Sequence, residues 1–140
     1  MTRMKVVLDV NILASAAASP AGLPAFIVDS LLNGPHRIAI SDEMLVTLGK
    51  VLIRKYFSAR LTEDMQAQAV ARYRGIGPPV TPDPTVIGVA DDEEDDRVLG
   101  TAVAAGVDFV VTGDKGMLAV RVCRGIPIVT ARQFLALVEL

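Results

Sequence analysis

Apolar runs and segments with a helical spacing of apolar residues alternate along this chain. Continuous apolar runs are typical of strands that are buried on both faces. They predict strands at residues 5–9, 37–40, 109–112 and 126–129. The helical spacing predicts helices at residues 11–18, 24–32, 41–54, 62–74 and 96–105, and a last helix from residue 130. Residues 75–84 are rich in Gly and Pro and predict a loop with at most one short strand.

Several expected helices begin with a recognisable capping residue. Ser41 and Thr62 stand where a side-chain oxygen can accept from the first free backbone N–H groups. Thr130 and Gln133 have the spacing of a capping box. Strands that alternate with helices imply a central parallel sheet of about four to five strands, with helices on both faces. With no linker long enough to divide it, the chain is expected to be a single α/β domain over residues 1–140.

Three aspartates stand where a strand should end or a helix should begin. Asp9 ends the first apolar run, Asp114 follows the run at residues 109–112, and Asp96 opens an alanine-rich helix. The carboxyl ends of parallel strands meet at one crevice, so these carboxylates are expected to lie together. Carboxylates that gather without cations repel one another unless a cation binds between them. The pattern favours a hard divalent cation, Mg²⁺ or Mn²⁺.

Composition narrows the chemistry. Cys123 and His36 are the only residues of their kinds, which excludes an internal disulfide, a cysteine metal cage and most histidine chemistry. His36, beside Pro35, is expected to be a solvated turn residue. Asp9 and Asn11 interrupt what would be the apolar core of a signal peptide, and no apolar stretch is long enough to span a membrane, so the expected location is cytoplasmic.

Charge is distributed unevenly around a net value of −2. Residues 91–96 are all acidic, whereas the charged residues of the segment 50–74 are mostly basic. An acidic centre flanked by basic surface suits a cation site that receives a polyanion. The candidates for phosphate contacts are Arg54, Lys55, Arg60, Arg72 and Arg74.

Oxygen-bound cations can activate water and stabilise the charge of a phosphodiester, which requires three or four carboxylates and no histidine. Asp92 and Asp96 share a helix face if the helix begins early. Each aspartate also has a plainer interpretation. Asp9 could simply cap a helix, Asp114 could belong to a tight turn, and the acidic run could be a solvated surface.

The motifs at residues 6–13, 95–99, 110–115 and 125–130 together resemble the PIN domain family over nearly the full chain. The resemblance is to the VapC-type toxin branch of that family. It implies an Mg²⁺-dependent endoribonuclease that cleaves RNA, is blocked by a cognate antitoxin and forms a homodimer. It assigns Asp9, Asp96 and Asp114 as catalytic metal ligands, with Asn11 and Thr112 as supporting polar residues.

The chain departs from the family pattern at one position. The family has Glu where this chain has Thr47, and threonine cannot supply that charge. Glu43, one helical turn earlier, or Asp92 could replace it. If neither does, the chain would be a weak or inactive PIN-fold binding module. A haloacid dehalogenase-type phosphatase is a further alternative because Asp9 follows a strand, although that chemistry needs an acid where this chain has Asn11.

Overall fold

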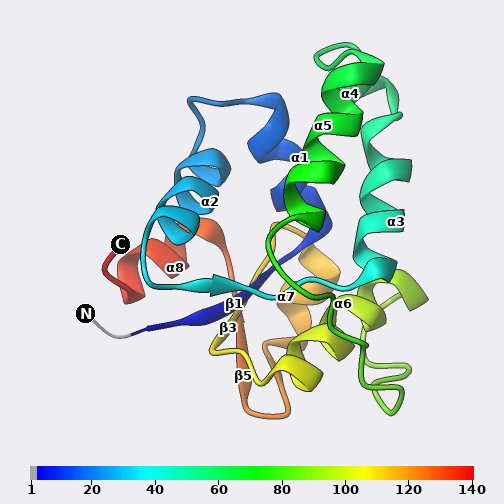
Figure 1. Cartoon of the computed structure of the whole chain (residues 1–140). Coiled ribbons are helices and arrows are strands. Elements are labelled where there is room, and N and C mark those ends of the chain that lie inside the picture. The colour runs from blue at the N-terminus through cyan, green and yellow to red at the C-terminus, as the bar shows by residue number, and fades with distance from the viewer. Residues whose placement is uncertain (1–2) are drawn as a thin grey trace.

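The computed structural model describes residues 3–140, in which a five-stranded sheet is surrounded by eight helices (Figure 1). In sheet order β2-β1-β3-β5-β4, the strands are β2 (Arg37–Ile38), β1 (Lys5–Leu8), β3 (Phe109–Val111), β5 (Ile126–Val129) and β4 (Val122–Cys123). The helices are α1 (Val10–Ala18), α2 (Leu23–Asn33), α3 (Asp42–Leu52), α4 (Lys55–Ser58), α5 (Glu63–Arg74), α6 (Glu93–Ala105), α7 (Lys115–Val120) and α8 (Ala131–Leu137).

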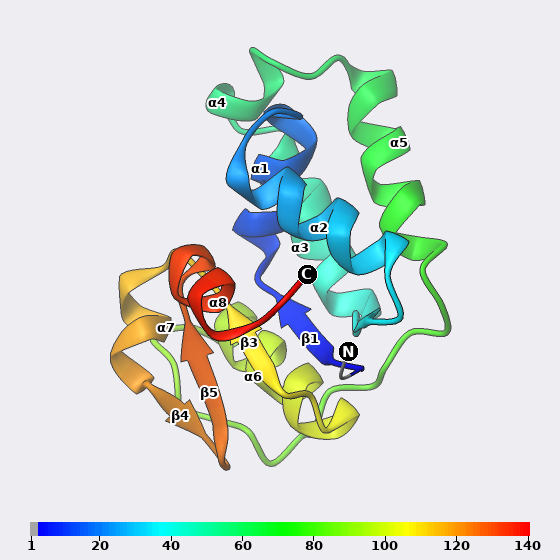
Figure 2. The ribbon, with the colours of Figure 1, turned by 90° about the vertical axis from the view of Figure 1, so that its left-hand side faces the viewer.

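Four of the five strands run parallel, and β4 pairs antiparallel with β5 at one edge. In the centre, Val7 is paired with Val110 and Leu8 with Val111, and all four side chains are buried. Figure 2 shows α8 in front of the sheet and α6 behind it. This confirms the expected α/β fold, and it places the ends of β1 and β3 side by side.

Several element boundaries differ from the expectation. β2 and β3 are shorter than expected, whereas residues 75–84 form the expected loop, without a strand. α6 begins three residues early, at Glu93, because Asp92 caps it by accepting from Asp95 N. α3 ends at Leu52, and a separate short helix α4 follows. Among the described residues, α7 and β4 were not anticipated, since each is too short to show a periodic pattern.

The expectation for His36 was wrong. The side chain is buried, and its Nδ1 accepts from Met4 N at 3.1 Å, next to the start of β1. This bond fixes the first residues of β1 against the segment that leads into β2.

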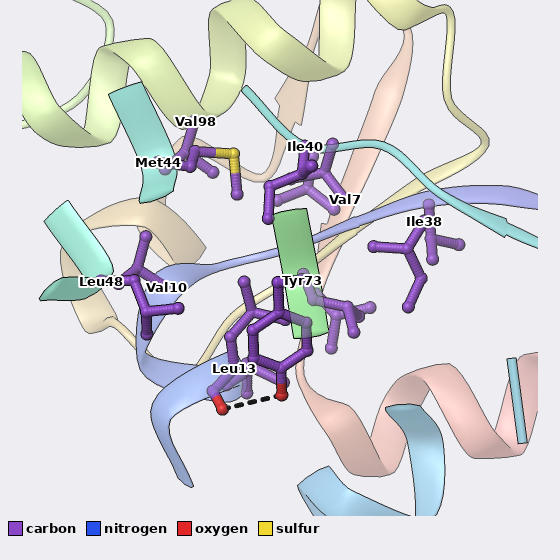
Figure 3. Close-up of a cluster of buried hydrophobic side chains, with 14 of the residues drawn as sticks. Val7, Val10, Leu13, Ile38, Ile40, Met44, Leu48, Tyr73 and Val98 are labelled. Atoms are coloured by element: carbon purple, nitrogen blue, oxygen red, sulfur yellow. Dashed lines mark hydrogen bonds between the residues drawn. The ribbon is translucent and has the colours of Figure 1, made fainter. Parts of the chain in front are cut away.

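The core joins the sheet to the helices. Figure 3 shows Val7, Ile40, Leu48 and other buried apolar side chains packed around Tyr73 of α5. The Tyr73 hydroxyl donates to Leu13 O of α1 at 3.0 Å, so the one polar atom of this large side chain is satisfied. Burial raises the pKa of Tyr73 to about 12.

In the part of the chain that the structure describes, no single helix has both the length and the apolar character to cross a membrane. Only α1 and α2 taken together meet both criteria, and they are bent by 101° at their junction.

Candidate active site

Asp9 lies between the end of β1 and the start of α1. Its carboxylate is buried, and Oδ1 accepts from Val10 N at 2.7 Å, which caps α1. Oδ2 accepts from the Thr112 hydroxyl at 2.6 Å. Burial is the main cause that raises the pKa of Asp9, and the two hydrogen bonds oppose it. The charges of Asp114 and Asp92 raise this pKa further, so both lie close enough to repel Asp9.

Thr112 connects Asp9 to Asp114. Its hydroxyl donates to Asp9 and accepts from Asp114 N at 3.0 Å, and the residue is fully buried between two strand ends. Asp114 then caps α7 by accepting from Met117 N at 2.9 Å. Asp9 therefore has the capping role that was its plainer interpretation, whereas Asp114, for which a tight turn was the plainer interpretation, caps a helix. Capping does not exclude a further role, because each carboxylate oxygen has more than one lone pair.

Asp95 is the carboxylate that the other acids affect most. The pKa of this half-buried group is raised to about 7, first by burial and then by Asp92, Asp9, Asp114 and Asp91 in that order. Four carboxylates from the ends of β1 and β3 and from the start of α6 thus act on one side chain. The principal acid of this cluster is Asp95, which the sequence interpretation did not choose.

Asp96, which sequence reasoning chose, is held differently. Its Oδ2 accepts from Gly88 N at 2.8 Å, and its Oδ1 accepts from Val89 N and Ala90 N at 3.1 and 2.8 Å. Both oxygens are thereby engaged by the backbone of the preceding loop. The sequence offered no means of separating Asp95 from Asp96, because adjacent helical residues point in directions 100° apart and either one could face the site.

A carboxylate from another helix lies beside Thr47, where the family pattern has glutamate. The Thr47 hydroxyl donates to Glu94 Oε2 at 2.9 Å, and Lys50 Nζ lies 3.8 Å from the same oxygen. Glu94 belongs to the first turn of α6, so sequence distance concealed it. Of the two residues expected to replace the family's glutamate, Asp92 caps α6 and Glu43 is half-buried one turn from Thr47, and both line the same cavity as Thr47.

A shallow cavity of about 550 Å³ adjoins the cluster between α3 and the start of α6. Its lining includes Glu43, Thr47 and Asp92 together with two cations, Lys50 and Arg97. Arg97 also lies 3.8 Å from Glu93 within its own helix. These two cations share the cavity with Asp92, whose charge acts on Asp9 and Asp95.

The five basic residues expected to hold phosphate differ in their surroundings. Arg72 pairs with Asp29 at 2.8 Å, and Arg74 lies 3.8 Å from Asp42. The Arg60 guanidinium stacks on the Tyr56 ring. Arg54 and Lys55 lie at α4, beyond the end of α3 that is remote from α6 (Figure 1).

Asn11, which was expected to be a supporting polar residue of the site, is exposed in the first turn of α1. Within residues 3–140, no three carboxylate, imidazole or thiol groups lie close enough to hold one metal ion in the present side-chain arrangement.

The fold and the site define an α/β domain with a carboxylate-lined site at the carboxyl edge of its sheet. The PIN domain family model matches residues 5–116, and the chain belongs to this family, whose members are generally nucleases. It is 27% identical over 123 residues to the uncharacterized protein MJ1680 of Methanocaldococcus jannaschii, covering 85% of this chain and 76% of that protein. The family assignment removes the haloacid dehalogenase alternative.

The fold is also similar to a chain in the crystal structure of VapBC2 from Rickettsia felis bound to a DNA fragment from their promoter. The TM-score is 0.63 at 13% identity, over 91% of this chain and 98% of that one. At this identity the similarity shows the fold.

Proposed function

We propose that this protein is a ribonuclease dependent on Mg²⁺ or Mn²⁺ and the toxin of a toxin–antitoxin pair. The observation that carries the proposal is the arrangement of carboxylates at the carboxyl ends of β1 and β3, where Thr112 joins Asp9 to Asp114 and where burial and four neighbouring carboxylates raise the pKa of Asp95 to about 7. Structural carboxylates are normally paired with cations or hydrogen-bond donors, so a pKa raised by like charges is typical of a functional site. Membership of a generally nucleolytic family supports the same conclusion.

The donor chemistry fits a hard divalent cation. Asp9, Asp95 and Asp114 offer oxygen ligands, and Asp92 adds a fourth carboxylate nearby. Since three groups do not yet converge in the described residues, rotation of at least one side chain has to accompany binding. A bound cation would stabilise the charge that develops on the phosphodiester and would favour deprotonation of the attacking water.

The chain's own residues prepare the site in three ways. Thr112 fixes the orientation of the Asp9 carboxylate and, through its acceptor lone pair, the backbone of Asp114. Burial of Asp9 excludes water from one side of the cluster. Lys50 and Arg97, at the adjoining cavity, are positioned to contact backbone phosphates of a bound strand.

The partner assignments follow from the family and the structural neighbour. RNA is the proposed substrate, a cognate antitoxin is the proposed inhibitor, and a homodimer is the proposed assembly. The VapBC2 structure supports the antitoxin partner only by its similar fold. Growth arrest on expression, relieved by the product of an adjacent gene for a small DNA-binding protein, would test this part separately.

A catalytically inactive binding module is the second candidate, and Thr47 motivates it. The hydrogen bond from Thr47 to Glu94 favours the enzyme over this alternative, because it restores an acid at the affected position. We therefore propose Glu94, rather than Glu43, as the substitute for the family's glutamate.

The decisive experiment compares RNA cleavage in Mn²⁺ by wild type and by Asp9→Asn, Asp95→Asn and Asp114→Asn, with Mn²⁺ affinity measured by calorimetry. Each variant is expected to lose cleavage by at least about a hundredfold while staying folded. Asp108→Asn is the matched control, because Asp108 lies at the amino-terminal ends of the parallel strands, where its carboxylate accepts from Lys5 N. A wild type that binds Mn²⁺ and cleaves no RNA would favour the binding module, and one that binds no Mn²⁺ would refute the site.

A further inference from the structure

Asp96 fixes the loop that precedes the cluster. It is one of the few buried acids in the described chain, with only 8% of its surface exposed. Its three acceptor contacts are all to consecutive backbone N–H groups, those of Gly88, Val89 and Ala90. A carboxylate with three such donors is bound firmly in its charged form.

The loop is anchored on both sides of this contact. Before it, Asp83 N donates to Gly100 O on α6 at 3.0 Å, and Arg124 lies 3.5 Å from the Asp83 carboxylate. After it, Asp92 caps α6. Asp91 therefore lies between two residues that α6 holds in place. Ala90 donates its N–H to Asp96, and Asp92 caps the helix. The backbone position of Asp91 is thereby set by α6.

The space that Asp91 occupies is provided by Gly116 of α7. A Cβ built on Gly116 would collide with Asp91 Oδ2 and would lie 3.1 Å from Asp114 Oδ2. Two carboxylate oxygens, from a loop and from the end of β3, therefore approach the same small volume above one glycine. Asp91 is thus a neighbour of Asp114, a member of the cluster, and its charge adds to those that raise the pKa of Asp95.

We propose that Asp91 is an additional carboxylate of the cation site, and that Asp96 is its positioning residue, acting through the backbone of residues 88–90 while Gly116 leaves room for it. This inference rests on the proposed function, since it concerns the same cation site. It explains two features that the cluster alone does not: why a buried acid faces away from the cluster, and why α7 has glycine in its first turn.

The first test is a double-mutant cycle on Mn²⁺ affinity, measured by calorimetry at a temperature at which all variants are folded. Asp91→Asn and Asp96→Asn are each expected to weaken binding roughly tenfold, as is common when a group that orients a metal ligand is removed. If Asp96 acts through Asp91, the double variant binds no more weakly than the weaker single variant. Full additivity, or an Asp96→Asn variant that is less stable but binds Mn²⁺ as wild type does, would overturn the inference.

The second test does not depend on a destabilised protein. Gly116 lies in a helix at a φ that other residues adopt, so Gly116→Ala should raise the thermal midpoint slightly through helix propensity. It should nevertheless weaken Mn²⁺ binding several-fold, because the added methyl displaces the Asp91 carboxylate. In an Asp91→Ala background the same substitution should leave Mn²⁺ affinity unchanged.

Two comparisons separate this inference from the proposed function. Asp108→Asn removes the same charge and the same kind of backbone contact at the opposite edge, and it should bind Mn²⁺ as wild type does. If Asp9→Asn abolishes binding while Asp91→Asn and Gly116→Ala bind normally, the cation site stands and this inference fails. If wild type itself binds no Mn²⁺, the proposed function fails and the inference with it.

Discussion

Asp95 and Asp96 are neighbours in sequence and differ entirely in their surroundings. The carboxylate of Asp95 faces other acids, whereas that of Asp96 faces backbone N–H groups. Replacing Asp95 by Asn should therefore relieve repulsion in the absence of cations, while Asp96→Asn replaces one acceptor oxygen by an NH2 group that faces a backbone donor. These hydrogen bonds predict that Asp96→Asn lowers the free energy of unfolding.

The buried hydroxyl of Tyr73 predicts a pH dependence of the free energy of unfolding. Its folded pKa of about 12 lies above the value of about 10 for an unfolded chain, because the buried hydroxyl is held neutral. The stability that it contributes is thus complete below pH 10 and is lost as the pH rises from about 10 to about 12. Tyr73→Phe should lower the free energy of unfolding at pH 8 by about 1 kcal/mol, through loss of the bond to Leu13 O.

Urea unfolding between pH 8 and pH 11.5 would measure this effect. The difference between wild type and Tyr73→Phe should shrink or reverse above pH 10, since only wild type has this ionisation. A constant difference over the whole range would show that the buried hydroxyl is not the group responsible.

At the scale of elements, the contact between α3 and α6 decides where the acids lie. α3 presents Thr47 to the first turn of α6, and early initiation of α6 at Glu93 places Glu94 opposite it. The expected helix start at Asp96 would have left Glu94 in a loop. A shift of one turn in a helix boundary therefore changes the interpretation of the whole acidic segment.

The contact between Thr47 and Glu94 can be tested by substitution of either residue and by their exchange. Glu94→Gln should reduce Mn²⁺ affinity and cleavage, because it removes the substitute acid. Thr47→Glu alone should give little gain, because the new carboxylate would repel Glu94 across the present 2.9 Å contact. The exchange Thr47→Glu/Glu94→Thr should restore wild-type affinity, and failure of the exchange to improve on Glu94→Gln would remove Glu94 from the site.

At the scale of the whole molecule, net charge of −2 means that a polyanion has to bind through local cations. Lys50 lies in the last turn of α3, the end that leads to α4, and its Nζ lies 3.8 Å from Glu94 Oε2 in the first turn of α6. Arg97, on α6, lines the same cavity as Lys50 and Asp92. Lys55 lies on α4, which follows the same end of α3, and it does not line that cavity.

This arrangement predicts which cations RNA contacts. Lys50→Ala/Arg97→Ala should weaken RNA binding similarly for all sequences and should reduce the slope of log affinity against log salt by about 0.7 per lost contact. Arg54→Ala/Lys55→Ala, with the same change of charge, is the matched control and should leave the slope unchanged. The measurement uses Ca²⁺ to suppress cleavage, and the reverse result would move the RNA path to α4.

The sequence alone determined the alternation of elements, and hence the α/β fold, because burial on both faces of a parallel sheet requires continuous apolar strands. It also determined that Asp9 and Asp114 each follow a strand, since position after a strand is a local property. Tertiary structure alone decided which acid of residues 91–96 faces the cluster, which helix supplies the acid opposite Thr47, and which cations lie beside it. These depend on helix phase and on packing between segments far apart in sequence, where a rotation of 100° or a shift of one turn redirects a side chain without altering the hydrophobic pattern.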